Sequence, residues 1–300
     1  LIRCDVGGRA AVEAMVAATL ERYGRVDIAI HNAGVCEMSA IEALSDEVLE
    51  TTLAINMKAA VWLTQACLPH FRKQGGGVVE AFSEGVAALE EVEWDFLVKF
   101  DADLSFGADY FLECLAKFVE DQTLGIGGGV ICQETGGRLR IESPGDPGFH
   151  VRGATKIYRK ACWDDIDGLV CLPGWDTVDE FQANRLGWRT RTFVDVPLRH
   201  HREAGGVDGA WKNWLKNGLA NYVCSYHPLF MLAKCARRVL QRPRLVAAAG
   251  LWFGYCGGYL RGKPRPADPD FRRYVHDQQL RKLMGRSSVY DLRLGPEELS

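Results

Sequence analysis

Residues 96–106 read FLVKFDADLSF, a short apolar run that ends in two carboxylates. The run 96–100 is typical of a buried β-strand that stops at Asp101. Asp101 and Asp103 are two positions apart, so in a strand their side chains point to the same face. Mg²⁺ and Mn²⁺ take few carboxylates and share the rest of their shell with phosphate and water. The stretch therefore predicts a divalent cation site at a sheet edge. The alternative is an aspartate-rich turn where a strand stops.

The composition is that of a globular chain with one large or two ordinary domains. Of its 300 residues, 47% are hydrophobic, and the formal net charge of −3 argues against a general nucleic-acid binder. The 10 cysteines include no Cys-x-x-Cys pair, which predicts small core residues in a reducing cytosol rather than a zinc or redox site. Leu1 lies inside a folded-domain pattern, so we expect a fragment or an irregular gene start.

The N-terminal region has the pattern of a helix, a strand and a second helix. Residues 9–23 carry apolar positions at helical spacing, and Gly24 is placed to end that helix. Residues 26–30 form a short β-rich run. Ser45 is expected to cap a helix, and another apolar helix is expected to follow from about residue 49 to 72. These elements suit a parallel α/β sheet, so the run 26–30 could extend the sheet that contains the strand 96–100.

Residues 1–77 resemble the middle of a short-chain dehydrogenase. The resemblance rests on VDIAIHNAG at 26–34 and LAINMKAAVWLTQACLP at 53–69. It also includes the pair that begins at Asp5, which matches the family's adenine-contacting pair. Asn56 stands at the position of the family's catalytic asparagine.

Two parts of the dehydrogenase site are missing from the stretches that should carry them. The glycine-rich phosphate turn does not occur before Asp5. No tyrosine occurs between residues 24 and 109, where the family's Tyr-x-x-x-Lys should follow. We therefore expect that the chain does not use NAD(P). Asn32, Gly34 and Asn56 are assigned structural roles, as two turn positions and a helix residue bonded to backbone.

The pattern changes at the glycines 75–77. Glu80, Glu84 and Glu90 stand at helical spacing, where a dehydrogenase would have a buried strand and a catalytic serine. From residue 78 to about 202, the chain instead resembles family-two glycosyltransferases of the GT-A fold, whose Asp-x-Asp strand holds a metal and the diphosphate of a nucleotide sugar. The resemblance implies a chimeric fusion with an incomplete, Rossmann-like GT-A sheet of the α/β class.

The donor side of the implied site contains five candidate residues. The resemblance implies that Asp103 and Asp101 bind Mn²⁺ or Mg²⁺. It also implies that the nucleotide sugar, with a UDP-sugar as the favoured donor, is bound by Asp101, Lys99, Arg152 and Gly153. Gly153 would let the backbone approach a ligand closely, and Arg152 could pair with phosphate. The alternative is an ordinary turn with a solvated arginine.

Further elements of the implied fold follow the Asp-x-Asp motif. Residues 106–120 are predicted to form a helix, and residues 124–132 a glycine-rich turn that enters a strand. The glycines 127–129 lack the Lys-Ser/Thr of a phosphate loop, so close packing or room for a sugar is the better interpretation.

The candidate base is Asp176, which takes the position of the aspartate in the family's Glu-Asp pair, with Trp175 in place of the glutamate. Inverting glycosyl transfer needs a group that accepts the proton of the acceptor hydroxyl. A carboxylate at a helix N-terminus is held ionised by the helix dipole. Asp179 and Glu180, one turn on, could share or replace this role. The alternative is that Asp176 caps the helix, with Asp179 and Glu180 as favourable first-turn charges.

Two histidines follow a predicted strand at 193–198. The resemblance implies that one of them, His200 or His201, is a further ligand for the metal or the phosphate. Imidazole suits Mn²⁺ better than Mg²⁺, and alternation along the strand allows only one of the two to face the site. The alternative is a pair of surface histidines in a basic turn.

The C-terminal third is mainly helical in pattern. Aromatic and basic residues interleave over 210–242, and residues 245–260 carry no charge. This uncharged run is shorter than the ~20 residues that span a bilayer. With Arg244 and Arg261 on either side, it suits an interfacial or re-entrant hairpin at a membrane surface. The alternative is a buried helical pair that covers the catalytic core.

We therefore expect three segments: a dehydrogenase-like fragment (1–77), the C-terminal half of a GT-A core (78–205) and a helical, membrane-surface region (206–300). The expected function is inverting, metal-dependent glycosyl transfer to a saccharide or lipid-linked acceptor, impaired by the missing nucleotide-binding half. The expected location is cytoplasmic, at the inner face of the membrane, without a nucleic-acid partner. The alternatives are a short-chain dehydrogenase-type oxidoreductase and a catalytically dead fusion or binding module.

Overall fold

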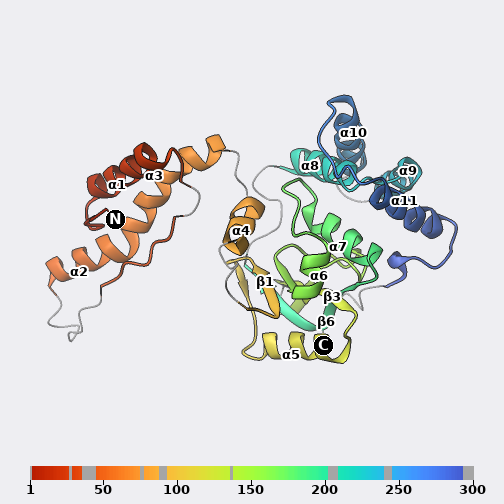
Figure 1. Cartoon of the computed structure of the whole chain (residues 1–300), viewed down its shortest axis with the longest axis horizontal. Helices are drawn as coiled ribbons and strands as arrows, with labels where there is room; N and C mark the ends of the chain where they lie inside the picture. The colour runs from red at the N-terminus through yellow and green to blue at the C-terminus, as the bar shows by residue number, and fades with distance from the viewer. Residues whose placement is uncertain are drawn as a thin grey trace. The chain divides into compact units, whose positions relative to one another are not determined.

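In the computed structural model the chain forms two compact units, Leu1–Glu90 and Glu91–Ser300, which Figure 1 shows. The predicted bounds at residues 77 and 205 do not coincide with this division and stay predictions. The structure describes residues 2–26, 29–35, 45–74, 78–87, 93–135, 138–201, 209–239 and 245–292.

The first unit is helical in its described residues. The predicted helix and its end at Gly24 are confirmed, since Gly24 is left-handed (φ 75°) and its N–H donates to the Leu20 carbonyl at 2.8 Å. Ser45 caps the second helix as predicted, because its hydroxyl accepts from the Val48 N–H at 3.3 Å. The elements are α1 (Arg9–Tyr23), α2 (Asp46–Leu53), a π-helical turn (Ala54–Lys58), α3 (Ala59–Gln74) and α4 (Val78–Ala87).

The predicted strand at 26–30 is not found in the residues that the structure describes. Val26 is buried with Val16 and Cys67 in a small core between α1 and α3. Ile30, by contrast, is 79% exposed and lies outside any strand. Asp27 and Ile28 lie outside the described residues. The expected extension of the sheet through this segment is therefore not supported.

The second unit contains a mixed sheet, which confirms the α/β class. Its order is β1-β5-β3-β6-β2, with β4 also paired to β3. The β3–β6 pair is parallel and the other pairs are antiparallel. The predicted strands 96–100, 124–132 and 193–198 all lie in it. The described strands are β1 (Phe96–Phe100), β2 (Leu104–Ser105), β3 (Leu124–Thr135), β4 (Arg138–Ile141), β5 (Thr155–Arg159) and β6 (Arg189–His200).

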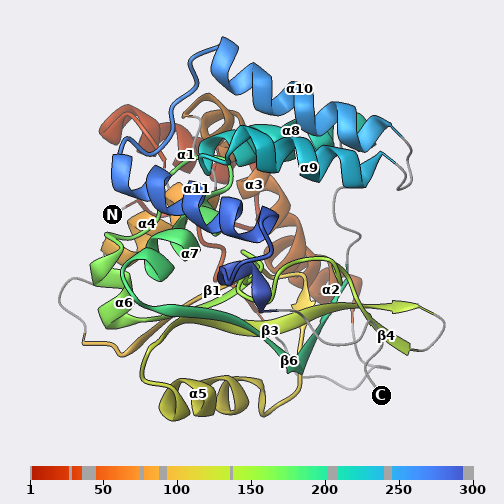
Figure 2. The same cartoon turned by 90° about the vertical axis from the view of Figure 1, so that its right-hand side faces the viewer.

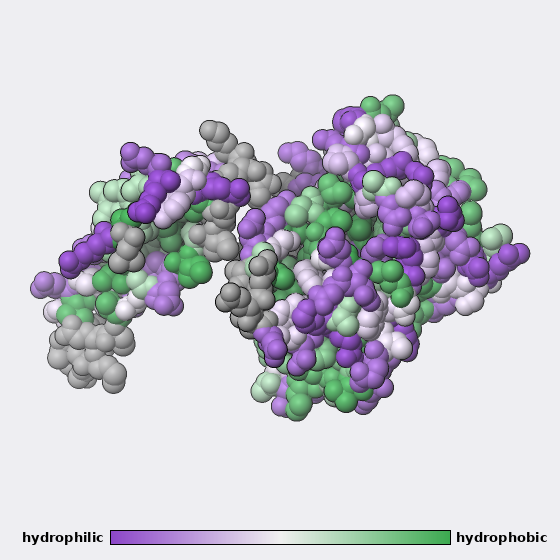
Figure 3. All heavy atoms as spheres, viewed as in Figure 1, coloured by the Kyte–Doolittle hydropathy of each residue, from purple (hydrophilic) through white to green (hydrophobic). Residues whose placement is uncertain are grey.

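Helices cover both faces of this sheet, as Figure 2 shows. α5 (Tyr110–Glu120) lies on one face, and α6 (Lys160–Asp165) and α7 (Trp175–Arg185) lie on the other. Phe118 of α5 meets Phe193 of β6 edge-on, with ring centroids 6.1 Å apart in a fully buried core. The outward side of α5 is also apolar, with Leu112 and Val119 each 70% exposed, and Figure 3 shows apolar residues gathered there.

The glycine run in β3 serves close packing, which is one of the two uses expected for it. An added Cβ at Gly128 would lie 2.0 Å from the Thr155 carbonyl oxygen, and one at Gly129 would lie 2.3 Å from that of Val196. Neither position has room for a sugar, so the glycines let β3 sit tightly between its neighbours.

The C-terminal part of the unit is helical, as predicted. α8 and α10 pack along one another, and half of α10 is buried against its neighbours. The segment 245–260 is thus one packed helix, and the expected re-entrant hairpin is wrong. Within the described ranges, no helix combines the length and the apolar character needed to cross a membrane. The helices are α8 (Ala210–Val223), α9 (Pro228–Arg238), α10 (Val246–Leu260) and α11 (Pro269–Leu283), followed by a 3₁₀ turn (Val289–Asp291).

Candidate functional site

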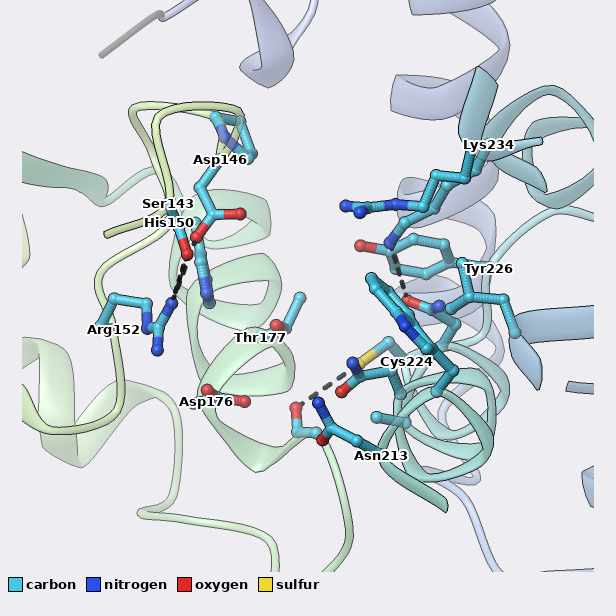
Figure 4. Close-up of a pocket in the computed structure, with 18 of the residues that line it drawn as sticks. Ser143, Asp146, His150, Arg152, Asp176, Thr177, Asn213, Cys224, Tyr226 and Lys234 are labelled. Atoms are coloured by element: carbon cyan, nitrogen blue, oxygen red, sulfur yellow. Dashed lines mark hydrogen bonds and ion pairs between the residues drawn. The ribbon is translucent and has the colours of Figure 1, made fainter. Parts of the chain in front are cut away.

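A cavity of about 690 Å³ opens beside the N-terminus of α7. Its walls come from the loop after β4, from the first turn of α7 and from the facing sides of α8 and α9. Figure 4 shows acidic and basic side chains on two opposite walls. One wall carries Ser143, Asp146, His150, Arg152, Asp176 and Thr177, and the other carries Asn213, Cys224, Tyr226 and Lys234.

Asp176 projects into this cavity from the first turn of α7. The N-cap position belongs to Gly174, which is left-handed with φ 84°, so the alternative that Asp176 caps the helix does not describe this structure. In the described parts of the chain, no donor is hydrogen-bonded to the Asp176 carboxylate. The carboxylate is therefore available to a ligand in the cavity.

The backbone under Asp176 is held by a buried lysine. Lys156 Nζ donates to the Asp176 carbonyl oxygen at 2.6 Å and to the two carboxylate oxygens of Asp179 at 2.8 and 2.9 Å. The same ammonium lies 2.9 Å from Glu180 Oε1. Burial alone would lower the pKa of Lys156, but the carboxylates of Asp179 and Glu180 outweigh burial and raise it. Lys156 is therefore a charged brace between β5 and α7.

Asp179 and Glu180 are part of this brace, which corrects their expected role as alternative bases. Asp179 also accepts from the Tyr158 hydroxyl at 2.6 Å, and Glu180 accepts from the Val151 N–H at 2.6 Å. Both carboxylates are buried and neither lines the cavity. Of the three candidate bases, only Asp176 lines the cavity.

His150 couples the cavity wall to the same buried cluster. Its Nδ1 lies 2.8 Å from Glu180 Oε2. Burial would lower the pKa of His150, but the Glu180 carboxylate outweighs burial and raises it to about 9. His150 is therefore protonated at neutral pH, where it offsets the charge of Glu180.

The two aspartates of the opening motif have different partners, which corrects the expectation that they share one face of a strand. β1 ends at Phe100, and Asp101 to Asp103 form a turn. The Asp101 carboxylate contacts the Lys99 ammonium, whereas Asp103 Oδ2 lies 3.6 Å from His200 Nε2. The chain must bend to leave β1 and enter β2, so the period-two alternation of a strand does not continue through the motif.

Of the two histidines, the structure places His200 beside Asp103. His200 Nδ1 lies 2.9 Å from Glu142 Oε2, which fixes the ring and directs Nε2 at Asp103. His201 Nε2 instead pairs with Ser105 Oγ at 3.0 Å. The alternation predicted along the strand therefore separates the two side chains.

Asp103 and His200 are the two candidate metal ligands that lie close to one another at this corner. In the ranges that the structure describes, no cluster of three or more His, Cys, Asp or Glu side chains is arranged to hold a metal ion. Two ligand atoms bound to one Mn²⁺ at about 2.1–2.2 Å can be up to ~4 Å apart, so Asp103 and His200 can share an ion. Phosphate and water oxygens would complete its shell.

Arg152 and Gly153 connect this corner to Asp176. Arg152 donates to Ser143 Oγ at 2.7 Å and lies 3.7 Å from Asp146, so it lines the cavity already paired. An added Cβ at Gly153 would lie 2.9 Å from the Trp175 ring. The glycine thus makes room for Trp175, not for a ligand. Lys99 is buried and its ammonium lies 5.6 Å from the centroid of the same ring.

Several residues of the site were not expected from the sequence. Lys156 is a buried charged residue, and Glu142 and Lys234 are half-buried ones. Each is a common residue in an unremarkable stretch of sequence. A lysine within the apolar strand TKIYR is the one signal that could have pointed to Lys156, because a strand lysine that faces a core needs a carboxylate partner.

Comparison with known proteins gives a family match for the first unit. Residues 1–90 match the family model for short chain dehydrogenases. The chain is 39% identical over 67 residues to an uncharacterized oxidoreductase of Thermotoga maritima, which covers 22% of this chain and 27% of that protein. It is 36% identical over 86 residues to D-threitol dehydrogenase of Mycolicibacterium smegmatis, covering 29% of this chain and 33% of that protein. The chain thus spans about a third or less of these relatives.

Solved structures add little to this match. A putative short-chain dehydrogenase/reductase from Burkholderia xenovorans shares 36% identity over 25% of this chain and 30% of its own, with a TM-score of 0.24. The mannosyltransferase PcManGT from Pyrobaculum calidifontis, solved with GDP-Man and Mn²⁺, shares 16% identity over 71% of this chain and 56% of its own, with a TM-score of 0.37. TM-scores this low do not establish a shared fold.

These comparisons support the dehydrogenase resemblance of the N-terminal segment. They extend it to residue 90 and favour the oxidoreductase alternative over glycosyl transfer. The expectation that NAD(P) is not used receives no support from them. Tyr259 and Lys263 do have the Tyr-x-x-x-Lys spacing, but they lie outside the matched residues, at the end of α10. The family match does not bear on the cavity, whose lining residues all lie beyond residue 90.

Proposed function

We propose that residues 91–300 transfer a glycosyl group from a nucleotide sugar to a hydroxyl acceptor, with inversion of the configuration at C1 of the sugar. The favoured donor is a UDP-sugar. The observation that carries this proposal is the carboxylate of Asp176, which has no hydrogen-bond donor among the described residues and lines a cavity of about 690 Å³. Glu142 lines the same cavity and is bonded to His200, which lies beside Asp103. The acceptor is a saccharide or a lipid-linked saccharide.

Asp176 is the proton acceptor in this proposal. It takes the proton of the acceptor hydroxyl as that oxygen bonds to C1 of the sugar, while the bond from C1 to the diphosphate oxygen breaks and the nucleoside diphosphate leaves. Lys156 holds the backbone of Asp176, which keeps the carboxylate at one place in the cavity. Asp103 and His200 would hold Mn²⁺ or Mg²⁺, which supplies positive charge to the leaving diphosphate.

Metal-dependent UDP binding tests this proposal. Calorimetric titration with UDP should give binding in the presence of Mn²⁺ and much weaker binding without it. Asp103→Ala and His200→Ala should each weaken the Mn²⁺-dependent binding about tenfold or more. His201→Ala is the matched control, since its ring pairs with Ser105 and not with Asp103. UDP affinity that changes neither with Mn²⁺ nor in His200→Ala would rule the proposal out.

A second candidate function concerns residues 1–90, and the family match favours it. We propose that this unit derives from an NAD(P)-dependent oxidoreductase of the short-chain dehydrogenase type. Titration with NADPH beside UDP and Mn²⁺ separates the candidates. Binding of NADPH alone supports the oxidoreductase, binding of UDP with Mn²⁺ alone supports glycosyl transfer, and binding of neither supports a catalytically dead fusion.

We also propose that the second unit associates peripherally with the inner face of the cell membrane. Phe253 and Leu260 of α10 are 60% and 87% exposed, and Trp211 of α8 lies beside Phe253, with ring centroids 6.2 Å apart. Co-sedimentation with vesicles that contain anionic lipid should recover the protein, and Phe253→Ser with Leu260→Ser should reduce that recovery. Equal recovery of both proteins would contradict this location.

A further inference from the structure

The wall of the cavity opposite Asp176 carries a row of three amides. Asn213, Asn217 and Asn221 stand four residues apart on α8, so they share one helix face, and all three line the cavity. Amide side chains both donate and accept hydrogen bonds, which suits the hydroxyls of a sugar ring.

Asn221 is the member of this row whose amide nitrogen lacks a hydrogen-bond acceptor in the described structure. The residue is 93% buried, being 7% exposed, and its Oδ1 accepts from Lys234 Nζ at 3.2 Å. Its Nδ2 is buried and has no hydrogen-bond partner in the described structure. A buried donor without an acceptor is costly, and an acceptor atom of a ligand in the cavity would relieve that cost.

Two cations from α9 stand beside the amide row. Lys234 and Arg238 both line the cavity, and in the described residues neither has a carboxylate within 4 Å. Each lies over an aromatic ring instead, Lys234 4.9 Å from the centroid of Tyr226 and Arg238 4.7 Å from that of Trp214. The rings hold the cations in place and leave their charges to face the cavity.

The charges of the two walls are separated. On the side of β4 and α7, Glu142, Asp146 and Asp176 outnumber two cations, Arg152 and His150, which already pair with carboxylates. Lys234 and Arg238 are on the side of α9. Figure 4 shows Asp146 and Asp176 across the cavity from Lys234. An anionic ligand is attracted to the second wall and repelled from the first, so a molecule that carries both an anion and hydroxyls has a preferred orientation.

We infer that the α8–α9 wall is an acceptor subsite for an anionic saccharide. The carboxylate or phosphate of the saccharide pairs with Lys234 and Arg238, and its ring hydroxyls form hydrogen bonds with the amides of α8. One hydroxyl of the saccharide reaches Asp176. The inference rests on the proposed glycosyl transfer and names the class of acceptor. A uronic acid and a sugar phosphate present the same anionic chemistry, and the experiment distinguishes them.

Ligand selectivity of the whole chain tests the inference. Binding is measured by NMR titration with methyl β-glucuronide, glucose 6-phosphate and the neutral methyl β-glucoside. At least one anionic probe should bind about tenfold more tightly than the neutral probe, since hydrogen bonds to charged groups are the stronger kind. The tighter anion identifies the source as carboxylate or phosphate. Equal affinities for all three probes would overturn the inference without any variant.

Substitutions then assign the preference to this wall. Lys234→Gln and Arg238→Gln should each lower the affinity for the anionic probe about tenfold and leave the neutral probe unchanged. Lys234→Arg, which keeps the charge, should retain the preference, and Lys212→Gln on the exposed side of α8 is the matched control. A preference that survives both charge-removing substitutions would place the anion elsewhere and overturn the subsite.

The dependence of binding on pH gives an independent readout. Burial and the neighbouring Arg238 lower the pKa of Lys234 to about 8, while Asp146 and the thiols of Cys224 and Cys235 oppose that shift. Affinity for the anionic probe should therefore fall as the pH rises through 8, and protons should be taken up on binding near that pH. An affinity that is constant from pH 6.5 to 9 would exclude Lys234 as the anion's partner.

The titration of UDP with Mn²⁺ on the same samples separates two failures. Retained UDP binding with no preference for an anion refutes the acceptor subsite alone. A preference for an anion without UDP binding refutes the proposed glycosyl transfer, and with it the acceptor role of this wall.

Discussion

Lys156 Nζ lies 2.8 Å from a carboxylate oxygen of Asp179, and both side chains are closed to solvent. One is on the inner strand β5 and the other is in the second turn of α7. The same ammonium holds the carbonyl of Asp176. Lys156 and its buried carboxylate partners thus join the sheet to the helix that presents the candidate base.

Removal of the lysine should destabilise the second unit strongly. Lys156→Met leaves the buried Asp179 carboxylate without a cation and Glu180 with His150 alone, and loss of one partner of a buried pair costs about 3–5 kcal/mol. The melting temperature followed by circular dichroism should fall by roughly 10 °C. Lys160→Met is the control, because its pair with Asp164 is exposed and is worth less than about 1 kcal/mol. Equal, small changes in the two variants would show that the buried pair is not a brace.

Loss of the carboxylate at Asp176 should abolish turnover but not binding. Asp176→Asn cannot accept a proton, and general base catalysis contributes about 10²–10⁴-fold to a rate. Release of UDP from a panel of UDP-sugars should fall by that factor, with UDP affinity and melting temperature unchanged. Asp164→Asn, on the exposed side of α6, should keep full activity. Activity of Asp176→Asn within a few-fold of the parent would exclude this residue as the base.

The His150–Glu180 pair should make stability depend on pH. The pKa of His150 is about 9 in the folded protein against 6.5 unfolded, because the Glu180 carboxylate outweighs burial. A raised pKa contributes stability that is complete below pH 6.5 and is lost as the pH rises towards 9. Denaturant unfolding should show a decrease on the order of 2 kcal/mol over that range. In His150→Gln this part of the decrease should be absent; an unchanged profile would contradict the assignment.

Two glycines of α10 should respond oppositely to alanine. A Cβ at Gly254 would lie 2.2 Å from the backbone oxygen of Leu215 in α8, so Gly254→Ala should force the helices apart and cost about 1–3 kcal/mol. A Cβ at Gly257 meets the end of the flexible Arg261 side chain at 3.2 Å, so Gly257→Ala should be neutral or stabilise the helix by up to ~1 kcal/mol. Thermal unfolding of both variants measures the difference, and a similar loss in the two would contradict the close helix contact.

In the first unit, Asn56 should protect one backbone amide. Its Oδ1 accepts from the Val35 N–H and its Nδ2 donates to the Val35 carbonyl, both at 2.8 Å. Asn56→Ala should speed hydrogen exchange of the Val35 amide about fivefold, the factor for a bond worth ~1 kcal/mol. The Gly24 amide, which is bonded to the Leu20 carbonyl, is the internal control and should not change. Unchanged exchange at Val35 would mean that the asparagine does not anchor this segment.

Local structure followed well from the sequence where one interaction decides it. Asn56 is hydrogen-bonded to the backbone as predicted. Ser45 caps the start of its helix, and Gly24 ends the helix before it. The helix expected over 106–120 is shorter in the structure and begins at Tyr110. The apolar helix expected over 49–72 contains a π-helical turn at Ala54–Lys58. A single extra residue in one turn does not change the apolar periodicity enough to be predicted from it.

The site was less predictable than the elements that carry it. Asp101 and Asp103 share a motif, yet the turn between β1 and β2 gives them different partners. Asp179 and Asp176 share a helix, yet one faces a buried lysine and the other a cavity. Partners of this kind lie far apart in the chain, so spacing along the sequence cannot identify them.

For FLVKFDADLSF, the sequence alone determined a strand over 96–100 that ends at acidic residues, because a short apolar run and its boundary are local properties. Only the tertiary structure decided what those residues do. Asp103 lies beside His200 because β2 pairs with the end of β6, and Asp101 remains with its neighbour Lys99. Which carboxylate can share a ligand is set by strand pairing, and strand pairing depends on how the whole sheet packs.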